Sequence, residues 1–260
     1  MEDNINVKNF YENNYDEDAR EGRETLEFVR SKLIIARYLA ESPMDIADVG
    51  GATGAYSFWL AEMGHRVHLL DLAANHIAIA QEKSRENGLA LAAYDCADAR
   101  ALPYSDASLD TVLLMGALYH LHSREDRVKC LAEAYRVLRP GGLIVCTVMC
   151  RYNILIAAHK YGFLDSYGKD AIELDLKTGI FEKANFYGHT PAEIVDEMTA
   201  AGFEGLEQIA VEGIANALGD NKIPANEKEA QGLLWSIQQT ESVPELIGVS
   251  RNIITVGRKR

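Results

Sequence analysis

Apolar and polar residues follow two different periods along this chain. Short apolar runs bounded by acidic residues or turn residues predict buried strands at 46–49, 65–71, 89–94, 109–115 and 143–148. Between these runs, apolar residues recur every three or four positions and predict helices over 23–41, 56–63, 73–87 and 123–138. Strands that alternate with helices in this way indicate a parallel sheet covered by helices on both faces.

The pattern changes after Cys150. A helical stripe occupies 154–164, an aromatic-rich segment follows, and Thr190-Pro191-Ala192-Glu193 is a capping box that opens a helix ending at Gly202. Strands are expected at 203–212 and 252–257, with a second helical stripe at 230–237 between them. We therefore expect a single domain over 1–260, with an N-terminal flap and helix at 1–43 and lid or substrate insertions at 151–188 and 213–250.

Composition and charge narrow the classes of function. The chain has 260 residues and a formal net charge of -13, which argues against a nucleic-acid partner and leans toward a neutral or cationic small-molecule substrate. The amino terminus is acidic and polar, unlike a signal peptide, and the longest apolar stretch, 111–121, is too short to cross a bilayer. A cytoplasmic protein with no membrane partner is expected.

The cysteines are expected to be reduced, buried thiols. Cys96, Cys130, Cys146 and Cys150 include no CxxC pair and fall in apolar patterns. A thiol cluster that binds a metal or arsenic is the less favoured alternative, and no metal site is expected.

The glycine-rich turn after the first predicted strand is the main candidate binding element. Gly50, Gly51 and Gly54 permit positive φ and close approach of a ligand, and the following helix directs free N–H groups at the turn. Because the carboxyl ends of parallel strands share one edge, Asp48, Asp71, Asp98 and the segment after Met115 should converge there. A dinucleotide-binding unit and a methyltransferase both fit this arrangement.

Further motifs separate the two interpretations. A full helix precedes the glycine turn, RVLRPGG stands before the fifth strand, and the chain closes with an apparent antiparallel strand pair. With DVGGATG, HLLDL, DCADA, LLMGALYHL, AGFEGLEQI and IITVGRK, the sequence resembles the class I S-adenosylmethionine-dependent methyltransferases of the small-molecule type found in bacteria. The likeness is close over about 44–143 and covers the rest in outline.

The resemblance implies an α/β, Rossmann-like, seven-stranded and mostly parallel sheet with helices on both faces, an antiparallel last strand and helical lid insertions. It implies methyl transfer from S-adenosyl-L-methionine to an O, N or S nucleophile of a small molecule by in-line displacement, in a monomer or homodimer. The alternatives are an NAD-dependent oxidoreductase and a non-catalytic S-adenosylmethionine-binding protein. Methylation of protein or RNA is also open, although the acidic balance argues against RNA.

The resemblance also assigns roles to residues. The wall from Asp48 to Gly54 would face the methionine part of the cofactor, with Ala52 where the family has a glycine. Asp71 would bind the ribose hydroxyls and Leu72 the adenine ring. The other expected cofactor residues are Asp98 (or Asp95) with Ala99 at the adenine amine, Met115 with Gly116 at the amino-acid end, and Tyr15, with Tyr11, in a flap over the ligand.

Two histidines after the fourth predicted strand are candidate general bases. His120 and His122 stand where the acidic group of an acceptor would lie, and an imidazole titrates near neutrality. The alternative is that one caps the next helix or packs against the lid. His189, just before the capped helix, has the same ambiguity.

Overall fold

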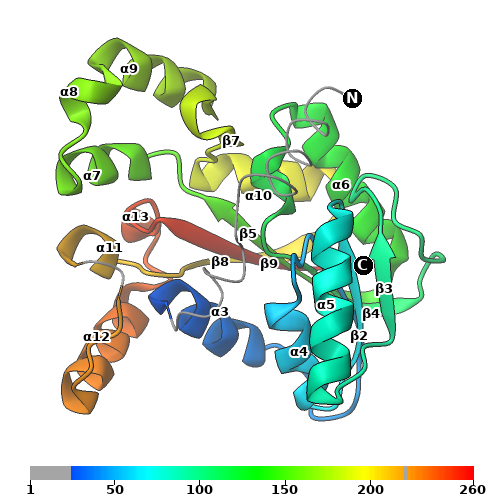
Figure 1. Ribbon diagram of the computed structural model, residues 1–260. Helices are drawn as coiled ribbons and strands as arrows, with labels where there is room; N and C mark the ends of the chain where they lie inside the picture. Colours follow the sequence, from blue (N-terminus) through cyan, green and yellow to red (C-terminus); the bar gives the residue numbers. More distant parts are fainter. Residues whose placement is uncertain (1–24, 220–221) are drawn as a thin grey trace.

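The computed structural model describes residues 25–219 and 222–260 and is built on a seven-stranded sheet in the order β3-β2-β1-β4-β5-β9-β8 (Figure 1). Neighbours from β3 to β5 pair in parallel, whereas β9 is antiparallel to both β5 and β8. The expected mostly parallel sheet with an antiparallel last strand is confirmed. The strands are β1 (Asp45–Val49), β2 (Arg66–Asp71), β3 (Ala93–Cys96), β4 (Leu109–Leu114), β5 (Leu138–Met149), β8 (Glu204–Ala210) and β9 (Asn252–Arg258).

Helices cover both faces of the sheet, because successive strand residues point to opposite sides. Ile46 of β1 clusters with Ile34 and Leu60 on one face, while Ala47 clusters with Leu131 on the other. The first face carries α3 (Leu26–Ala36), α4 (Ala55–Glu62) and α5 (Ala74–Asn87), and the second carries α6 (Arg124–Val137) and α10 (Pro191–Ala200) (Figure 1).

Local signals in the sequence fix several helix ends. The Ser123 and Thr190 side chains accept hydrogen bonds from the amides three residues later, and Glu193 completes the capping box at Thr190. Gly88 ends α5 in the left-handed conformation, as predicted. These ends depend only on neighbouring residues, which is why the sequence predicts them well.

Two strand boundaries differ from the predictions. Pro140-Gly141-Gly142 does not separate α6 from the fifth strand, since α6 ends at Val137 and β5 begins at Leu138. The pairing shifts register between Leu109 and Thr111 of β4, so the Pro-Gly-Gly segment forms an irregularity inside β5. The third strand begins at Ala93 rather than Leu89, because the apolar Leu91 packs into the core before pairing starts.

The two predicted insertions contain the remaining elements. Residues 151–188 form an arch beside the sheet, and the helices of the second insertion, 213–250, lie below this arch in Figure 1. The first holds α7 (Asn153–Lys160), α8 (Leu164–Tyr167), α9 (Lys169–Thr178), β6 (Ile180–Phe181), η2 (Glu182–Ala184) and β7 (Phe186–Tyr187). The second holds α11 (Ala215–Leu218), α12 (Glu227–Thr240) and α13 (Pro244–Ile247). Within the described ranges, no helix has the length and apolar character needed to cross a membrane.

All four cysteines are free thiols. Cys130, Cys146 and Cys150 are buried as expected, and burial raises the pKa of each. The expectation for Cys96 is wrong: it ends β3 at the open edge of the sheet and is exposed. In the part of the chain that the structure describes, no group of three or more His, Cys, Asp or Glu residues is arranged to hold a metal ion.

Two alanines with left-handed backbone generate a stability prediction. Ala52 has φ 49° and Ala107 has φ 51°. Glycine relieves about 1 kcal/mol of steric cost there and loses about 0.5 kcal/mol to unfolded-chain entropy. We expect Ala52→Gly and Ala107→Gly each to raise the free energy of unfolding by roughly 0.5 kcal/mol, measured by urea denaturation.

The control is Ala78→Gly, in the exposed middle of α5, which should lower the free energy of unfolding by about 1 kcal/mol. Destabilisation by all three substitutions would contradict the interpretation.

Candidate functional site

The loop after β1 is held tightly against the neighbouring strand. The Gly50 and Gly51 amides donate to the Leu70 carbonyl at 2.8 and 3.2 Å, and Gly50 and Gly54 have φ of 74° and 92°. A Cβ on Gly51 would lie 2.6 Å from the Asp48 carboxyl carbon, so only glycine fits.

Asp48 lies beneath this loop. Its side chain is completely buried, and Oδ2 accepts a hydrogen bond from the Ser57 hydroxyl at 2.7 Å. Because Ser57 belongs to α4, the carboxylate joins the end of β1 to the helix that follows the loop. The position of Asp48 is that of a support for the loop.

The segment after β4 lies against the loop after β1. A Cβ on Gly50 would be 3.3 Å from the Cβ of Ala117, in the 3-10 helix η1 (Ala117–His120). Gly116 is close to the Tyr119 hydroxyl, and the Met115 sulfur accepts a weak hydrogen bond from Thr147 at 3.5 Å. The structure thus brings together the two loops that the topology predicts to share the carboxyl edge.

Asp71 is the polar centre of this edge. Its Oδ2 accepts from the Ala52 amide at 2.9 Å and its Oδ1 from the Ala73 amide at 2.9 Å, with His76 Nδ1 at 3.2 Å from Oδ1. A carboxylate has about four lone-pair positions, so Asp71 can accept at least one further hydrogen bond. Sequence reasoning missed His76, whose only signal is its place in the first turn of the next helix.

The predicted adenine side contains an unexpected arginine. Arg100 contacts both carboxylate oxygens of Asp98, with Nη2 at 2.8 Å from Oδ2, and also pairs with Asp126 at 2.7 Å. The alternative acid, Asp95, accepts a hydrogen bond from the Tyr104 hydroxyl at 2.9 Å. Burial first, and this carboxylate second, raise the pKa of Tyr104.

The remaining predicted adenine residues lie beside this group. Leu72 and Ala99 are both half-buried. The Leu72 carbonyl lies 3.6 Å from the Cys96 sulfur. Tyr11 and Tyr15 lie outside the described residues.

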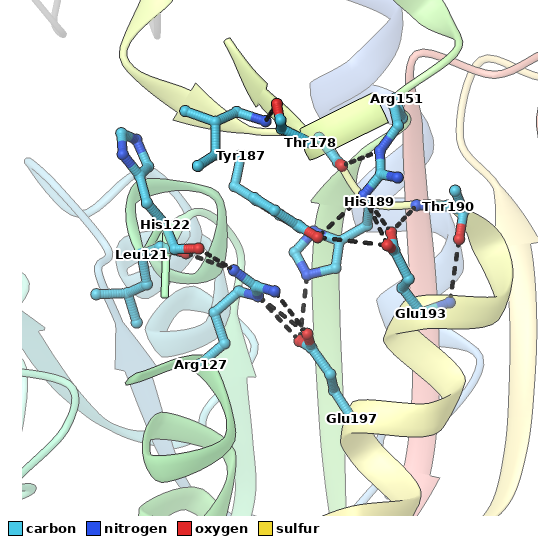
Figure 2. A network of polar contacts seen from close by, with 12 residues as sticks. Leu121, His122, Arg127, Arg151, Thr178, Tyr187, His189, Thr190, Glu193 and Glu197 are labelled. Carbon is cyan, nitrogen blue, oxygen red and sulfur yellow. Dashed lines mark hydrogen bonds and ion pairs between the residues drawn. The ribbon is translucent and has the colours of Figure 1, made fainter. Parts of the chain in front are cut away.

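The three candidate histidines occupy different environments. His120 ends η1 with its ring 4.6 Å from that of Tyr119. Figure 2 shows the His122 imidazole pointing away from Arg127, whose guanidinium donates a hydrogen bond to the His122 carbonyl. His189 is fully buried, and burial lowers its pKa. The structure therefore places His189 in the protein interior and His120 on η1, the short helix that contacts Gly50 through Ala117.

A buried charge network joins the segment after β4 to the arch of 151–188 and to α10 (Figure 2). The Arg127 guanidinium donates to Glu197 at 2.7 Å and to the carbonyls of Leu121 and His122 at 2.9 and 2.7 Å. It also lies over the Tyr187 ring, 3.6 Å from the centroid. One buried cation therefore contacts three elements that are distant in sequence.

A second arginine, Arg151, extends the network to the β6–β7 hairpin of the arch. Arg151 donates to the Tyr187 hydroxyl at 2.9 Å, to the Gly188 carbonyl at 2.9 Å and to Glu193 at 2.7 Å. His189 Nε2 lies 3.3 Å from the Glu197 carboxylate. Neither Arg127 nor Arg151 has a sequence signal, because their partners come from elements that only the folded chain brings together.

A cavity of about 450 Å³ lies beyond the carboxyl end of β5, under the arch of 151–188. Its floor includes Met149 and Cys150, and rings form much of its wall, with Phe181 and Phe186 stacked at 4.7 Å. The lining comprises Met149, Cys150, Asn153, Ile154, Ile156, Ala157, Lys160, Tyr161, Phe163, Tyr167, Phe181, Ala184, Phe186, Asn216 and Arg251.

Comparison with known sequences identifies the central part of the chain. A family model described as a methyltransferase domain matches residues 47–146. The methyltransferase GfsG of Streptomyces halstedii is 28% identical over 200 residues, which cover 75% of this chain and 70% of the relative. The ubiquinone/menaquinone biosynthesis C-methyltransferase UbiE of Acidiphilium cryptum is 34% identical over 121 residues, 45% of this chain and 46% of that protein. The match to the second relative thus spans less than half of its length.

Solved structures share the fold. An S-adenosylmethionine-dependent methyltransferase from Thermotoga maritima superposes with a TM-score of 0.59 at 17% identity, over 90% of each chain. The superposition extends into the 151–188 and 213–250 segments, which lie outside the residues that the family model matches.

The lowered pKa of His189 generates a prediction about pH. The unfolded state takes up a proton as the pH falls through about 6.5, whereas the buried imidazole stays neutral, so this residue makes the folded state lose stability on acidification. We expect the stability difference between wild type and His189→Gln to shrink as the pH falls from about 7.5 to about 5.5, measured by chemical denaturation.

The control is His159→Gln, which removes an exposed imidazole from α7 and should leave the pH profile of the wild type unchanged. Parallel pH profiles for wild type and His189→Gln would show that the neutral buried histidine is misassigned.

Proposed function

We propose that this chain, a class I S-adenosylmethionine-dependent methyltransferase, transfers a methyl group to an O, N or S atom of a small molecule held in the 450 Å³ cavity. The methyltransferase interpretation of the motifs is confirmed, and the NAD-dependent alternative is not retained. The observation that carries the proposal is the meeting of the two glycine loops and Asp71 at one edge of the sheet, beside an aromatic pocket. A carbon acceptor is the second candidate, because the UbiE relative is named a C-methyltransferase.

The residues at this edge fit the cofactor. We assign the methionine part to the surface of Gly50, Gly51, Ala52 and Gly54, where the backbone lacks bulky side chains, with Asp48 supporting it from beneath. Met115 and Gly116 lie opposite across the loop contact and complete this end.

The nucleoside part is assigned to the other side of Asp71. The remaining lone pair of the Asp71 carboxylate is available to a ribose hydroxyl, and Leu72 offers an apolar surface to the base. Asp98 and Ala99 take the adenine amine, with Arg100 holding the Asp98 carboxylate in place. Tyr15 remains a flap candidate from the sequence alone.

S-adenosylmethionine supplies an already activated methyl group, so the protein needs no covalent intermediate. Its contribution is alignment of the acceptor atom, methyl and sulfur, worth up to about 7–11 kcal/mol. We propose that the 151–188 arch and the 213–250 segment form the lid that excludes water from this geometry. The Arg127 and Arg151 network would hold the arch against the segment after β4.

An acceptor oxygen or nitrogen that must lose a proton requires a base. We assign this role to His120, on the helix that contacts the glycine loop, with His122 as the second candidate.

The cofactor assignment is tested at Asp71. Asp71→Asn removes the charge while keeping the shape, and loss of a hydrogen bond to a charged group should weaken S-adenosylmethionine binding about 10- to 100-fold, measured by calorimetry. The control is Asp106→Asn, an exposed carboxylate in the turn that leads to the amino end of β4. Unchanged affinity in Asp71→Asn, or binding of NAD in place of S-adenosylmethionine, would overturn the assignment.

The catalytic assignment is tested by methyl transfer. Full-length protein incubated with methyl-labelled S-adenosylmethionine and a panel of small-molecule nucleophiles should yield a labelled product. His120→Gln should lower its rate about 10²- to 10⁴-fold without changing cofactor affinity. Cofactor binding without transfer to any acceptor would instead favour the non-catalytic alternative, and an equal rate in His120→Gln would exclude His120 as the base.

A further inference from the structure

The aromatic cavity has an electrostatic character opposite to that of the whole chain. The formal net charge is -13, yet no Asp or Glu is among the described residues that line the cavity, whereas Lys160 and Arg251 are. The nearby Asp175 accepts a hydrogen bond from the Tyr167 hydroxyl at 2.6 Å, and its carboxylate is not part of the lining.

The two cations lack carboxylate partners. Among the described residues, the Lys160 ammonium makes its one hydrogen bond to the Asn216 carbonyl, at 3.2 Å, and no acid lies within ion-pair distance of either Lys160 or Arg251. The buried Arg127 and Arg151, by contrast, are each paired with a glutamate.

Lys160 is linked through Asn216 to the segment that carries Arg251. Lys160 contacts the Asn216 backbone, and the Asn216 amide donates to the Val249 carbonyl at 2.9 Å, two residues before Arg251. Arg251 is itself fixed through its carbonyl, which accepts from the Cys150 amide at 2.8 Å. The rings of Phe181 and Phe186 come from the β6–β7 hairpin.

Unpaired cations beside an apolar wall favour one kind of ligand. Aromatic walls bind a planar apolar body through its buried area and ring contacts. An ammonium and a guanidinium attract an anionic group that the negatively charged remainder of the surface repels.

We infer that the methyl acceptor is a small molecule with a planar, apolar body and an anionic group, the body lying among the rings and the anion at Lys160 and Arg251. The inference rests on the proposed function, since it takes this cavity as the acceptor site. It reverses the expectation of a neutral or cationic substrate drawn from net charge alone, because the local charge of the pocket differs in sign from the total.

Two probes that differ by one anionic group test the inference. 1-Anilinonaphthalene-8-sulfonate and its neutral parent N-phenyl-1-naphthylamine are titrated by fluorescence into the full chain. Lys160→Gln and Arg251→Gln should each weaken binding of the sulfonate about five- to tenfold and leave binding of the neutral probe unchanged. Lys129→Gln, an exposed lysine on α6, is the matched control and should change neither.

The site of binding is checked with Ala157→Trp, which fills the cavity and should abolish binding of both probes. Equal sulfonate affinity in wild type and in the Lys160→Gln/Arg251→Gln double variant, or undiminished binding in Ala157→Trp, would overturn the inference. Calorimetry with S-adenosylmethionine on the same samples separates the two proposals. Intact cofactor binding with a negative probe result contradicts only the acceptor class, whereas absent cofactor binding contradicts the proposed function.

Discussion

The hydrogen bonds to the Asp71 carboxylate hold the cofactor edge of this molecule together. One oxygen accepts from the amide of Ala52 in the loop after β1, and the other accepts from Ala73 at the start of α5. Two turns that lie on either side of β2 are thereby fixed to one strand end. The Ala52 amide points at the carboxylate because its backbone is left-handed, so the conformational cost at Ala52 and the hydrogen bond to Asp71 belong together.

The region around the cavity is organised by a different kind of contact. Arg127 donates hydrogen bonds to the buried Glu197 carboxylate and to two carbonyls of the segment after β4. The flat face of its guanidinium packs on Tyr187 of the β6–β7 hairpin. Removing one partner of a buried ion pair typically costs about 3–5 kcal/mol, because the other charge is left without compensation. Charged side chains therefore join the arch to α6 and α10, the helices that cover this face of the sheet.

What the sequence predicts here is what depends on neighbours along the chain. Local geometry determines the strand and helix periods, the Ser123 and Thr190 caps and the glycine turn, so the sequence predicts all of them. It does not predict the start of β3 or the course of β5 through Pro140, because pairing with another strand decides them. The same holds for part of the site: the acid at Asp71 is predicted, whereas the Arg100–Asp126 pair and the aromatic cavity depend on contacts between distant parts of the chain. His76 is an exception, since it lies five residues after Asp71 but no motif marks it.

The order of the site residues along the chain has an evolutionary consequence. The residues assigned to the cofactor end at Gly116, whereas the lining of the cavity within 25–219 and 222–260 begins at Met149. The two regions meet through the sheet and the Arg127 network rather than by sharing side chains. With the proposed assignment of the two sites, substitutions in the second half of the chain can alter which acceptor is bound while the cofactor contacts persist. A lineage with this division can diversify its chemistry of acceptors without passing through variants that lose the methyl donor.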